Sequence, residues 1–174
     1  DGFANSVELI EALSEAGKFE ISVSCYPEPH PNSRGWDEDL AFLKAKQDAG
    51  AKRAITQFFF EPDTYLRFVE KARAKGITMP LVPGIMLQPN FAGLKRMAGM
   101  VQATIPAWLD RLYDGLDSDD ETRDLVTATV AAELCHKLAD EGVSDFHFYT
   151  LNRAGLALST CRLLGMKPKP AQAA

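Results

Sequence analysis

The chain has 174 residues, of which 46% are hydrophobic and 25% charged, so it can bury one sizeable core. Its formal net charge of −5 argues against a nucleic-acid surface, which needs clustered Lys and Arg, and no apolar run approaches the ~20 residues of a membrane span. No signal peptide is visible, and the three widely spaced cysteines suggest reduced thiols of a cytoplasmic protein without a metal site.

Helices and strands alternate from the start of the chain. The first predicted elements are a helix opened by Asn5–Glu8 and stopped at Gly17, a strand over Glu20–Cys25 and a helix from Asp37 to Gly50. Between this strand and the second helix, Tyr26–Gly35 carries three prolines at alternate positions. Alternate prolines favour extended backbone, so we expect a stiff loop.

A central strand is predicted over Arg53–Phe60, which holds β-branched and aromatic residues without Gly or Pro. Period-2 geometry puts Gln57 on one face with Ile55 and Phe59. An amide is unusual near the carboxyl end of such a strand, which is the end where parallel α/β folds bind ligands. Gln57 therefore either contacts a ligand or is satisfied by neighbouring backbone.

The remaining elements continue the alternation. They are a helix from Pro62 to Gly76, a strand over Pro80–Met86 that bends at Pro83, a helix capped by Asn90, a short helix starting in Thr104–Trp108, a long helix opened by the capping box Ser118–Glu121 and ending near Glu141, a strand over Ser144–Thr150 and a closing helix capped by Asn152. The long helix is expected to bury Val126, Val130, Leu134 and Leu138. Residues 168–174 are predicted to be a disordered tail.

This order predicts right-handed βαβ units and a parallel sheet. Two α/β architectures fit about four βα units: a small open sheet, or the second half of a (β/α)8 TIM barrel, which typically needs ~250 residues. Four strands cannot close a barrel. On the second interpretation, residues 1–167 are the C-terminal half of one catalytic domain, and the native chain extends upstream of Asp1.

Polar residues follow the predicted strand ends. They are Tyr26 and His30 after the first strand, Asp39 and Lys46 on the next helix, Gln57, Tyr149 late in the last strand, and Arg153 at the start of the closing helix. Each has an ordinary alternative: a surface His, a solvated helix face, a half-buried Tyr and a first-turn Arg. A cation at a helix N-terminus opposes the helix dipole, and an anionic partner would offset this. Because parallel strands end at one edge, we expect these residues to converge there.

Four blocks, in order and spacing, resemble the methylenetetrahydrofolate reductase family. They are Tyr26–Pro31, Ile55–Phe60 after Asp48–Ala51, Val82–Ile85 and Phe146–Arg153, with further matches at Ile105–Pro106 and Asp114–Leu116. The resemblance is to the shorter bacterial form and covers nearly all of the chain. It implies a cytoplasmic, homo-oligomeric flavoprotein of one-carbon metabolism. In this family NADH or NADPH reduces FAD, and the flavin passes a hydride to 5,10-methylenetetrahydrofolate, giving 5-methyltetrahydrofolate.

The resemblance also implies roles for single residues. FAD contacts are implied for Tyr26, His30, Asp39 and Lys46, and contacts to folate or to the nicotinamide nucleotide for Gln57, Tyr149 and Arg153. Met97 stands where the family has an aromatic or branched apolar residue that stacks on substrate; its ordinary alternative is a core filler. A primary amide matches the mixed donors and acceptors of a pterin, and Arg suits an anionic partner. The family's general-acid Glu and an Asp near the flavin belong to the first half of the barrel, so no catalytic residue is expected in this chain.

Two rival functions remain open. A related flavin or folate enzyme could keep the cofactor site and act on a different substrate. A non-catalytic half-barrel could instead serve as an interaction or assembly module. Bound FAD would support either enzyme and remove the module.

Overall fold

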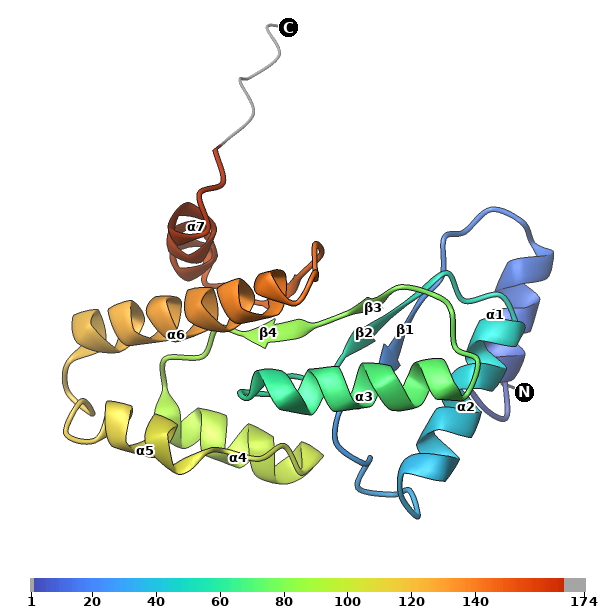
Figure 1. The fold of residues 1–174 in the computed structure, drawn as a ribbon, viewed down its shortest axis with the longest axis horizontal. Coiled ribbons are helices and arrows are strands. Elements are labelled where there is room, and N and C mark those ends of the chain that lie inside the picture. Colours follow the sequence, from blue (N-terminus) through green and yellow to red (C-terminus); the bar gives the residue numbers. More distant parts are fainter. Residues whose placement is uncertain (1, 168–174) are drawn as a thin grey trace, which may run out of the picture.

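The computed structural model describes residues 2–167, so the tail predicted for 168–174 lies outside the described residues. Short strands alternate with helices, as the sequence pattern predicts (Figure 1). The elements in chain order are α1 (Ser6–Glu15), β1 (Ser22–Cys25), α2 (Trp36–Asp48), β2 (Arg53–Thr56), α3 (Pro62–Ala74), β3 (Leu81–Val82), β4 (Gly84–Met86), α4 (Phe91–Val101), α5 (Ala107–Tyr113), α6 (Asp120–Asp140), β5 (His147–Tyr149) and α7 (Ala154–Leu163).

The strands form two parallel sheets joined by one bend of the chain. β1, β2 and β3 pair in that order, and β4 pairs with β5. Only Pro83 separates β3 from β4, and its carbonyl accepts a hydrogen bond from the N–H of His147 at 3.0 Å. The predicted bent strand over Pro80–Met86 is confirmed, and the mixed α/β class with parallel strands is confirmed with it.

The central strand is shorter than the sequence predicts. β2 ends at Thr56, whereas the prediction ran to Phe60. Its neighbours explain the early end, because β1 stops at Cys25 and β3 stops at the bend. One further ladder bond remains, from the N–H of Gln57 to the carbonyl of Cys25 at 2.8 Å. Residues 58–60 then leave the sheet and bury their rings.

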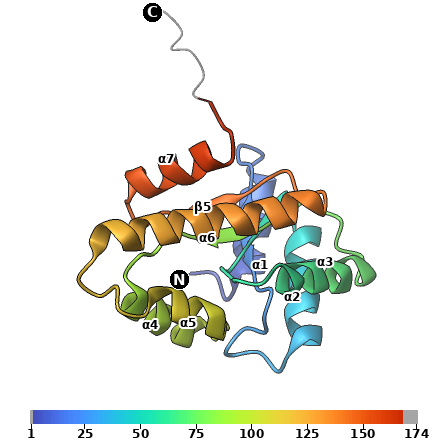
Figure 2. The same cartoon turned by 60° about the vertical axis from the view of Figure 1, so that its left-hand side comes forward.

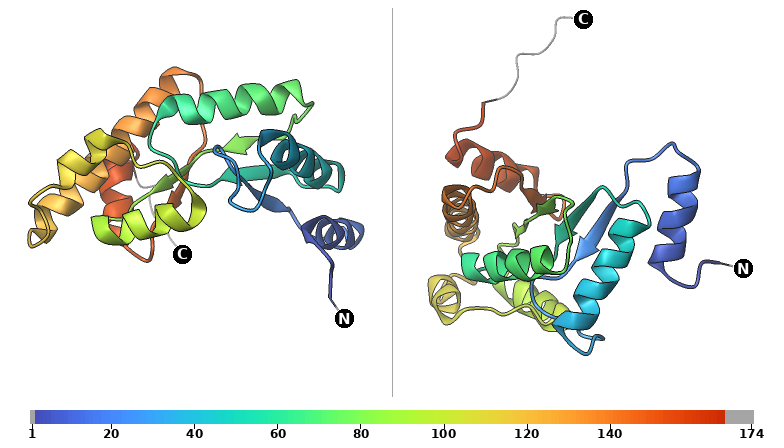
Figure 3. Two further views of the ribbon diagram at one scale, coloured as in Figure 1. Left: turned by 90° about the horizontal axis from the view of Figure 1, so that it is seen from below. Right: turned by 45° about the vertical axis from the view of Figure 1, so that its right-hand side comes forward.

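One face of the β1–β3 sheet is buried and the other is partly exposed. The buried face carries Cys25, Ala54 and Leu81, which belong to the same core cluster as apolar residues of α2 and α3. The opposite face carries Ser24 and Arg53, which are exposed. Figure 3 shows α2 and α3 lying along these strands, with α1 beyond α2 at the end of the molecule.

Two further core clusters surround the second sheet. Phe59 and Ile85 pack with α6 and α7 in one of them, and Figure 2 shows α6 and α7 running beside β5. Phe58, Phe60 and Met86 pack with α4 and α5 in the other. The aromatic residues after β2 thus alternate between two clusters, as the period-2 pattern predicts.

Three helices, α1, α4 and α6, start at a side-chain cap. The side chains of Asn5 and Asn90 accept hydrogen bonds from backbone N–H groups at the starts of α1 and α4, as predicted. At α6 the predicted cap is wrong by one residue. Asp119, not Ser118, is the cap, since its carboxylate accepts from both the N–H and the hydroxyl of Thr122.

The predicted cap at Asn152 is also wrong. The turn after β5 needs two successive left-handed residues, Leu151 with φ 47° and Asn152 with φ 63°. Asn tolerates this conformation better than most residues, so Asn152 serves the turn and does not cap the helix. The helix therefore begins later, at Ala154, with Arg153 in the cap position and no side-chain cap.

The buried stripe of α6 is rotated relative to the prediction. Leu134 and Leu138 are buried as expected, whereas Val126 and Val130 are only half-buried. The rest of the buried face consists of small residues: Thr127, Ala128, Ala131, Ala132 and Cys135. Small residues let α6 pack close to its neighbours. A search for large apolar residues at helical spacing does not detect such a face.

Within residues 2–167, no helix combines the length and the apolar character needed to cross a membrane.

Candidate functional site

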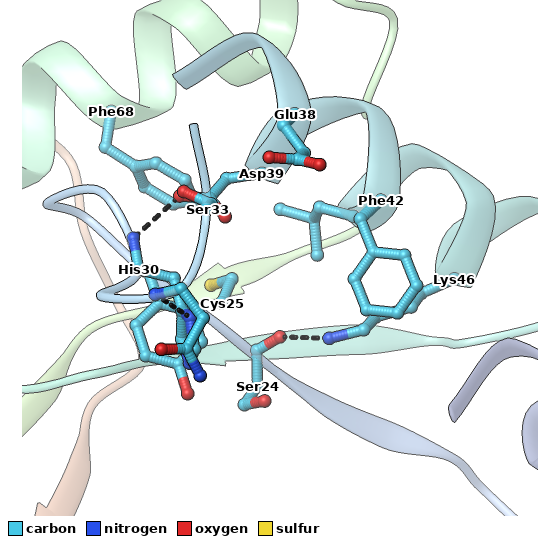
Figure 4. Close-up of a pocket in the computed structure, with 12 residues that line it drawn as sticks. Ser24, Cys25, His30, Ser33, Glu38, Asp39, Phe42, Lys46 and Phe68 are labelled. Atoms are coloured by element: carbon cyan, nitrogen blue, oxygen red, sulfur yellow. Dashed lines mark hydrogen bonds between the residues drawn. The ribbon is translucent and has the colours of Figure 1, made fainter. Parts of the chain in front are cut away.

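A cavity of about 360 Å³ opens between the carboxyl end of β1, the loop Tyr26–Gly35 (the 26–35 loop) and α2 (Figure 4). It is lined by Ser24, Cys25, Tyr26, His30, Asn32, Ser33, Glu38, Asp39, Phe42, Leu43, Lys46 and Phe68. All four residues that the resemblance assigns to FAD, namely Tyr26, His30, Asp39 and Lys46, line this one cavity. These four belong to one consecutive strand, loop and helix, whereas Gln57, Tyr149 and Arg153, which were expected to converge with them, do not line this cavity.

The 26–35 loop is anchored to α2 through the backbone of His30. Its N–H donates to Oδ2 of Asp39 at 2.8 Å, so this carboxylate is a loop anchor as well as part of the cavity wall. The ring of His30 stands edge-on to Tyr26, with centroids 4.5 Å apart. Its Nδ1 accepts from the N–H of Asn32 at 3.1 Å, which in a neutral ring leaves the proton on Nε2. Nε2 of His30 has no hydrogen-bond partner within residues 2–167 and can donate to a ligand.

Lys46 is buried, contrary to the solvated helix face that the sequence allowed. Only 7% of it is exposed, because Leu40, Leu43 and Lys46 share the face of α2 that packs on the sheet. Its Nζ donates to the carbonyl of Ser24 at 3.1 Å and lies 4.8 Å from the centre of the Phe42 ring. Burial lowers the pKa of the Lys46 ammonium, although Cys25 and Asp39 oppose the shift.

Cys25 lies in the cavity wall but is a buried, unreactive thiol. Burial raises its pKa to about 12, against the smaller opposing effect of Lys46. The thiolate is the reactive form, so nucleophilic chemistry at this position is not supported. No group of three or more His, Cys, Asp or Glu within residues 2–167 could hold a metal ion.

Gln57 lies one residue beyond β2 and is half-buried. Its Oε1 accepts a hydrogen bond from the N–H of Phe58 at 3.0 Å. Part of the amide is thus satisfied by neighbouring backbone, the ordinary alternative that the sequence left open. Its Nε2 donors have no hydrogen-bond acceptor among the described residues, so they are available to a ligand.

Tyr149 reaches across the fold to the end of β2. Its hydroxyl donates to the carbonyl of Thr56 at 2.9 Å. Burial raises the pKa of this hydroxyl, and the neighbouring Cys25 and Tyr26 act in the same direction. Tyr149 is therefore a neutral donor close to Cys25 and Tyr26, which line the cavity. Its bond to Thr56 also places it beside the residue that precedes Gln57.

Arg153 and Met97 do not line the cavity. Arg153 is half exposed, and its Nη1 lies 3.8 Å from Oδ1 of Asp124 on α6. This is a weak surface pair that leaves the guanidinium open to another anion. Met97 is half-buried on α4 and packs with the cluster that contains Phe58, as a core filler would.

Sequence reasoning missed cavity residues that helix spacing could have found. Glu38 and Phe42 precede Lys46 by eight and four residues on α2, so all three lie on one helix face. Phe68 comes from α3, and only the tertiary packing of α3 against α2 brings it to the cavity.

Comparison with known proteins gives the family. A sequence profile described as Methylenetetrahydrofolate reductase matches residues 1–165. The chain belongs to the methylenetetrahydrofolate reductase family. The resemblance carried by the four sequence blocks is thereby confirmed.

Bacterial members of the family are similar over nearly the whole chain. The 5,10-methylenetetrahydrofolate reductase of Pectobacterium carotovorum subsp. carotovorum is 47% identical over 167 residues, covering 96% of this chain and 56% of that protein. The 5,10-methylenetetrahydrofolate reductase of Escherichia coli (strain K12) is 48% identical over 161 residues, covering 92% of this chain and 54% of that protein. The chain spans about half the length of these curated relatives.

One solved structure has a fold similar to that of this chain. It is described as an uncharacterized protein from Clostridium thermocellum that binds two copies of 5-methyl-5,6,7,8-tetrahydrofolic acid. Its TM-score is 0.59 at 15% sequence identity, covering 92% of this chain and 59% of that one. At this identity the likeness supports the mixed α/β fold and nothing further.

Proposed function

We propose that the chain is the C-terminal half of a bacterial-type methylenetetrahydrofolate reductase barrel that binds FAD in the cavity beside the 26–35 loop (the FAD cavity). The observation that carries this proposal is the meeting of Tyr26, His30, Asp39 and Lys46 around one cavity. They come from a strand end, a loop and a helix, and the family resemblance assigns all four to the same cofactor.

The partly exposed face of the β1–β3 sheet supports a partial barrel. In a (β/α)8 barrel, helices cover the outer face and the inner face is filled by side chains from all eight strands. Here α2 and α3 cover one face of β1–β3, while Ser24 and Arg53 on the other face remain exposed. Further strands of the same domain would cover that face and complete the interior.

The side chains around the cavity fit the nucleotide part of FAD. Lys46 Nζ has one carbonyl partner, Ser24, so its other N–H donors are open to a phosphate or a ribose hydroxyl. His30 has a free ring nitrogen, and Asp39 has a second carboxylate oxygen available to accept from a hydroxyl. The cavity thus offers two donors and one acceptor around an apolar wall that includes Phe42.

Bound FAD would supply the hydride chemistry that no side chain can provide. The residues of this chain bind and orient the reactants around it. The free Nε2 of Gln57 would donate to the pterin of 5,10-methylenetetrahydrofolate or to the carboxamide of NAD(P)H. Tyr149, held neutral by burial, would border the same place, and Arg153 would attract an anionic part of either substrate.

The flavin spectrum and the turnover of the purified full-length protein test this proposal together. We expect bound FAD and NAD(P)H-dependent reduction of 5,10-methylenetetrahydrofolate to 5-methyltetrahydrofolate. Bound FAD without folate turnover would favour a related flavin enzyme with another substrate. A protein that takes up no FAD would contradict both enzyme functions and favour an interaction module.

A further inference from the structure

The connection Gln102–Pro106 between α4 and α5 (the 102–106 connection) is tied to the 26–35 loop by one carboxylate. Glu28 accepts from the N–H of Thr104 with Oε2 at 3.0 Å and from the hydroxyl of Thr104 with Oε1. The two residues are 76 positions apart in the sequence. Both oxygens of Glu28 are therefore used on a single partner residue.

A second carboxylate ties the same region to the segment after β2. Glu61, the cap residue of α3, accepts from Nε1 of Trp108 on α5 at 2.5 Å. Glu28, Glu61 and Thr104 line one cavity of about 330 Å³ between these segments. Two successive strand-to-helix loops thus hold the end of α4 and the start of α5 from the same side.

The 102–106 connection sets where α4 ends. Gln102 is left-handed, with φ 55°, and the N–H of Ala103 donates back to the carbonyl of Ala98 at 3.0 Å. A left-handed conformation is unfavourable for a residue other than Gly unless the surroundings hold it. Thr104, two residues further on, donates both hydrogen bonds to Glu28.

We propose that Glu28 is a positioning residue for the substrate side of the site. It holds the 102–106 connection against the 26–35 loop and thereby sets the place of α4, with Met97, relative to the FAD cavity. This inference rests on the proposed function. Glu28 is not in the lining of the FAD cavity, so its effect on substrate is separable from cofactor retention.

The residue type fits this role. A carboxylate accepts two hydrogen bonds in parallel from the N–H and the hydroxyl of one Thr, whereas Gln offers one acceptor oxygen and an unmatched NH2 group. The flanking Pro27 and Pro29 stiffen the backbone on both sides of Glu28. The carboxylate therefore projects from a rigid loop. Because the loop does not adjust, the position of Glu28 fixes the position of Thr104.

The test uses the full-length protein loaded with FAD. Glu28→Ala should raise the KM for 5,10-methylenetetrahydrofolate by about ten- to a hundredfold, the range expected when substrate-positioning groups shift. FAD content and the flavin spectrum should stay as in the parent. Thr104→Val removes only the hydroxyl bond, so it should raise the KM by less than Glu28→Ala does. Thr104→Ser keeps both bonds, so its KM should equal that of the parent. Glu70→Ala, which removes an exposed carboxylate from α3, is the matched control and should leave the KM unchanged.

Amide hydrogen exchange at Thr104 provides a readout that does not depend on turnover. Its N–H should exchange faster in Glu28→Ala than in the parent. An unchanged KM in Glu28→Ala, or a loss of activity that only follows loss of FAD, would overturn the positioning role. If the parent has FAD but no folate turnover, the proposed function fails, and the exchange result still shows whether Glu28 fixes the 102–106 connection.

Discussion

The hydroxyl of Tyr149 donates to the carbonyl of Thr56 at 2.9 Å, although β5 and β2 are neighbours in neither sheet. The bond passes Gly84, the first residue of β4. A Cβ at Gly84 would collide with the carbonyl oxygen of Thr56 and with the ring of Tyr149. Gly84 is therefore needed for space and not for an unusual backbone angle, since its φ is not positive. This contact joins the two sheets where the site is built.

Gly84→Ala should destabilise the protein because the added methyl group must displace a ring or a carbonyl. Overpacking of this kind typically costs about 1–3 kcal/mol. We expect a lower midpoint in urea-induced unfolding of the full-length protein and weaker substrate binding, since Tyr149 would be displaced.

Gly99→Ala is the matched control for this prediction. Gly99 lies in α4, and nothing stands within 4 Å of a Cβ added there. Ala is preferred over Gly inside a helix by about 1 kcal/mol, so this change should raise the stability slightly. Equal stability of the two variants would contradict the close approach at Gly84.

Lys46→Met should lower FAD affinity while leaving the apo protein at least as stable. Met keeps a long apolar side chain in a buried place and removes a charge that burial disfavours. Loss of one hydrogen bond to a charged group costs about 1.5–3 kcal/mol, so FAD should dissociate about ten- to a hundredfold more readily. Flavin fluorescence titration measures this, and Lys44→Met on the more open side of α2 should retain FAD.

The pH dependence of the same variant has a definite sign. The folded pKa of Lys46 is lowered, so the folded state gives up its proton at a lower pH than the unfolded chain does. The cost that the buried ammonium imposes on the free energy of unfolding is full at pH values below the folded pKa. It disappears as the pH rises to the ordinary pKa of Lys. The apo parent should therefore gain stability relative to Lys46→Met as the pH rises. A difference that is constant with pH would contradict the burial of the ammonium.

Cys135 should contribute an alkaline loss of stability. Burial raises the pKa of its thiol from 9.0 to about 12, so the unfolded chain ionises first as the pH rises. The contribution of the neutral Cys135 thiol to the free energy of unfolding is complete below pH 9. It declines toward pH 12 by at most about 1.4 kcal/mol per pH unit. The destabilisation caused by Cys135→Ala should accordingly shrink over this range. The nearby truncation Leu134→Ala, with no ionisable group, should show no such trend in urea unfolding.

The parts of the fold that depend on local sequence could be predicted. Apolar periodicity together with start and stop signals located the helices within residues 2–167, and Pro83 located the bend that divides the third strand between the sheets. The meeting of Tyr26, His30, Asp39 and Lys46 could be predicted because one strand, the loop after it and the next helix are consecutive in the sequence. The burial of Lys46 was within reach as well, since position 46 continues the stripe of Leu40 and Leu43.

Other features depend on neighbours that a single segment does not reveal. The end of β2 is set by where β1 and β3 stop, and the face of α6 by small residues such as Ala131. Glu28 gave no local signal at all, because its partner Thr104 lies 76 residues away. Long-range polar contacts of this kind require the tertiary structure.

Gln57 has two roles that substitutions can separate. Its Oε1 accepts from the N–H of Phe58, while its Nε2 is the proposed donor to folate or nicotinamide. Gln57→Glu keeps an acceptor for Phe58 and removes the donor, whereas Gln57→Ala removes both. If the ligand role is correct, both variants should lose folate-dependent turnover by about ten- to a hundredfold, which corresponds to one lost buried hydrogen bond. FAD should stay bound in both.

Stability distinguishes the ordinary alternative for Gln57. Loss of the bond to Phe58 costs about 0.5–1.5 kcal/mol, so Gln57→Ala should unfold slightly more easily and Gln57→Glu should not, apart from the cost of a half-buried carboxylate. If Gln57 serves only its neighbour Phe58, turnover per folded, FAD-containing protein should stay normal in Gln57→Glu. Measuring kcat and KM on protein quantified by its flavin absorbance decides between the two, because any unfolded fraction that has lost FAD is then left out of the count.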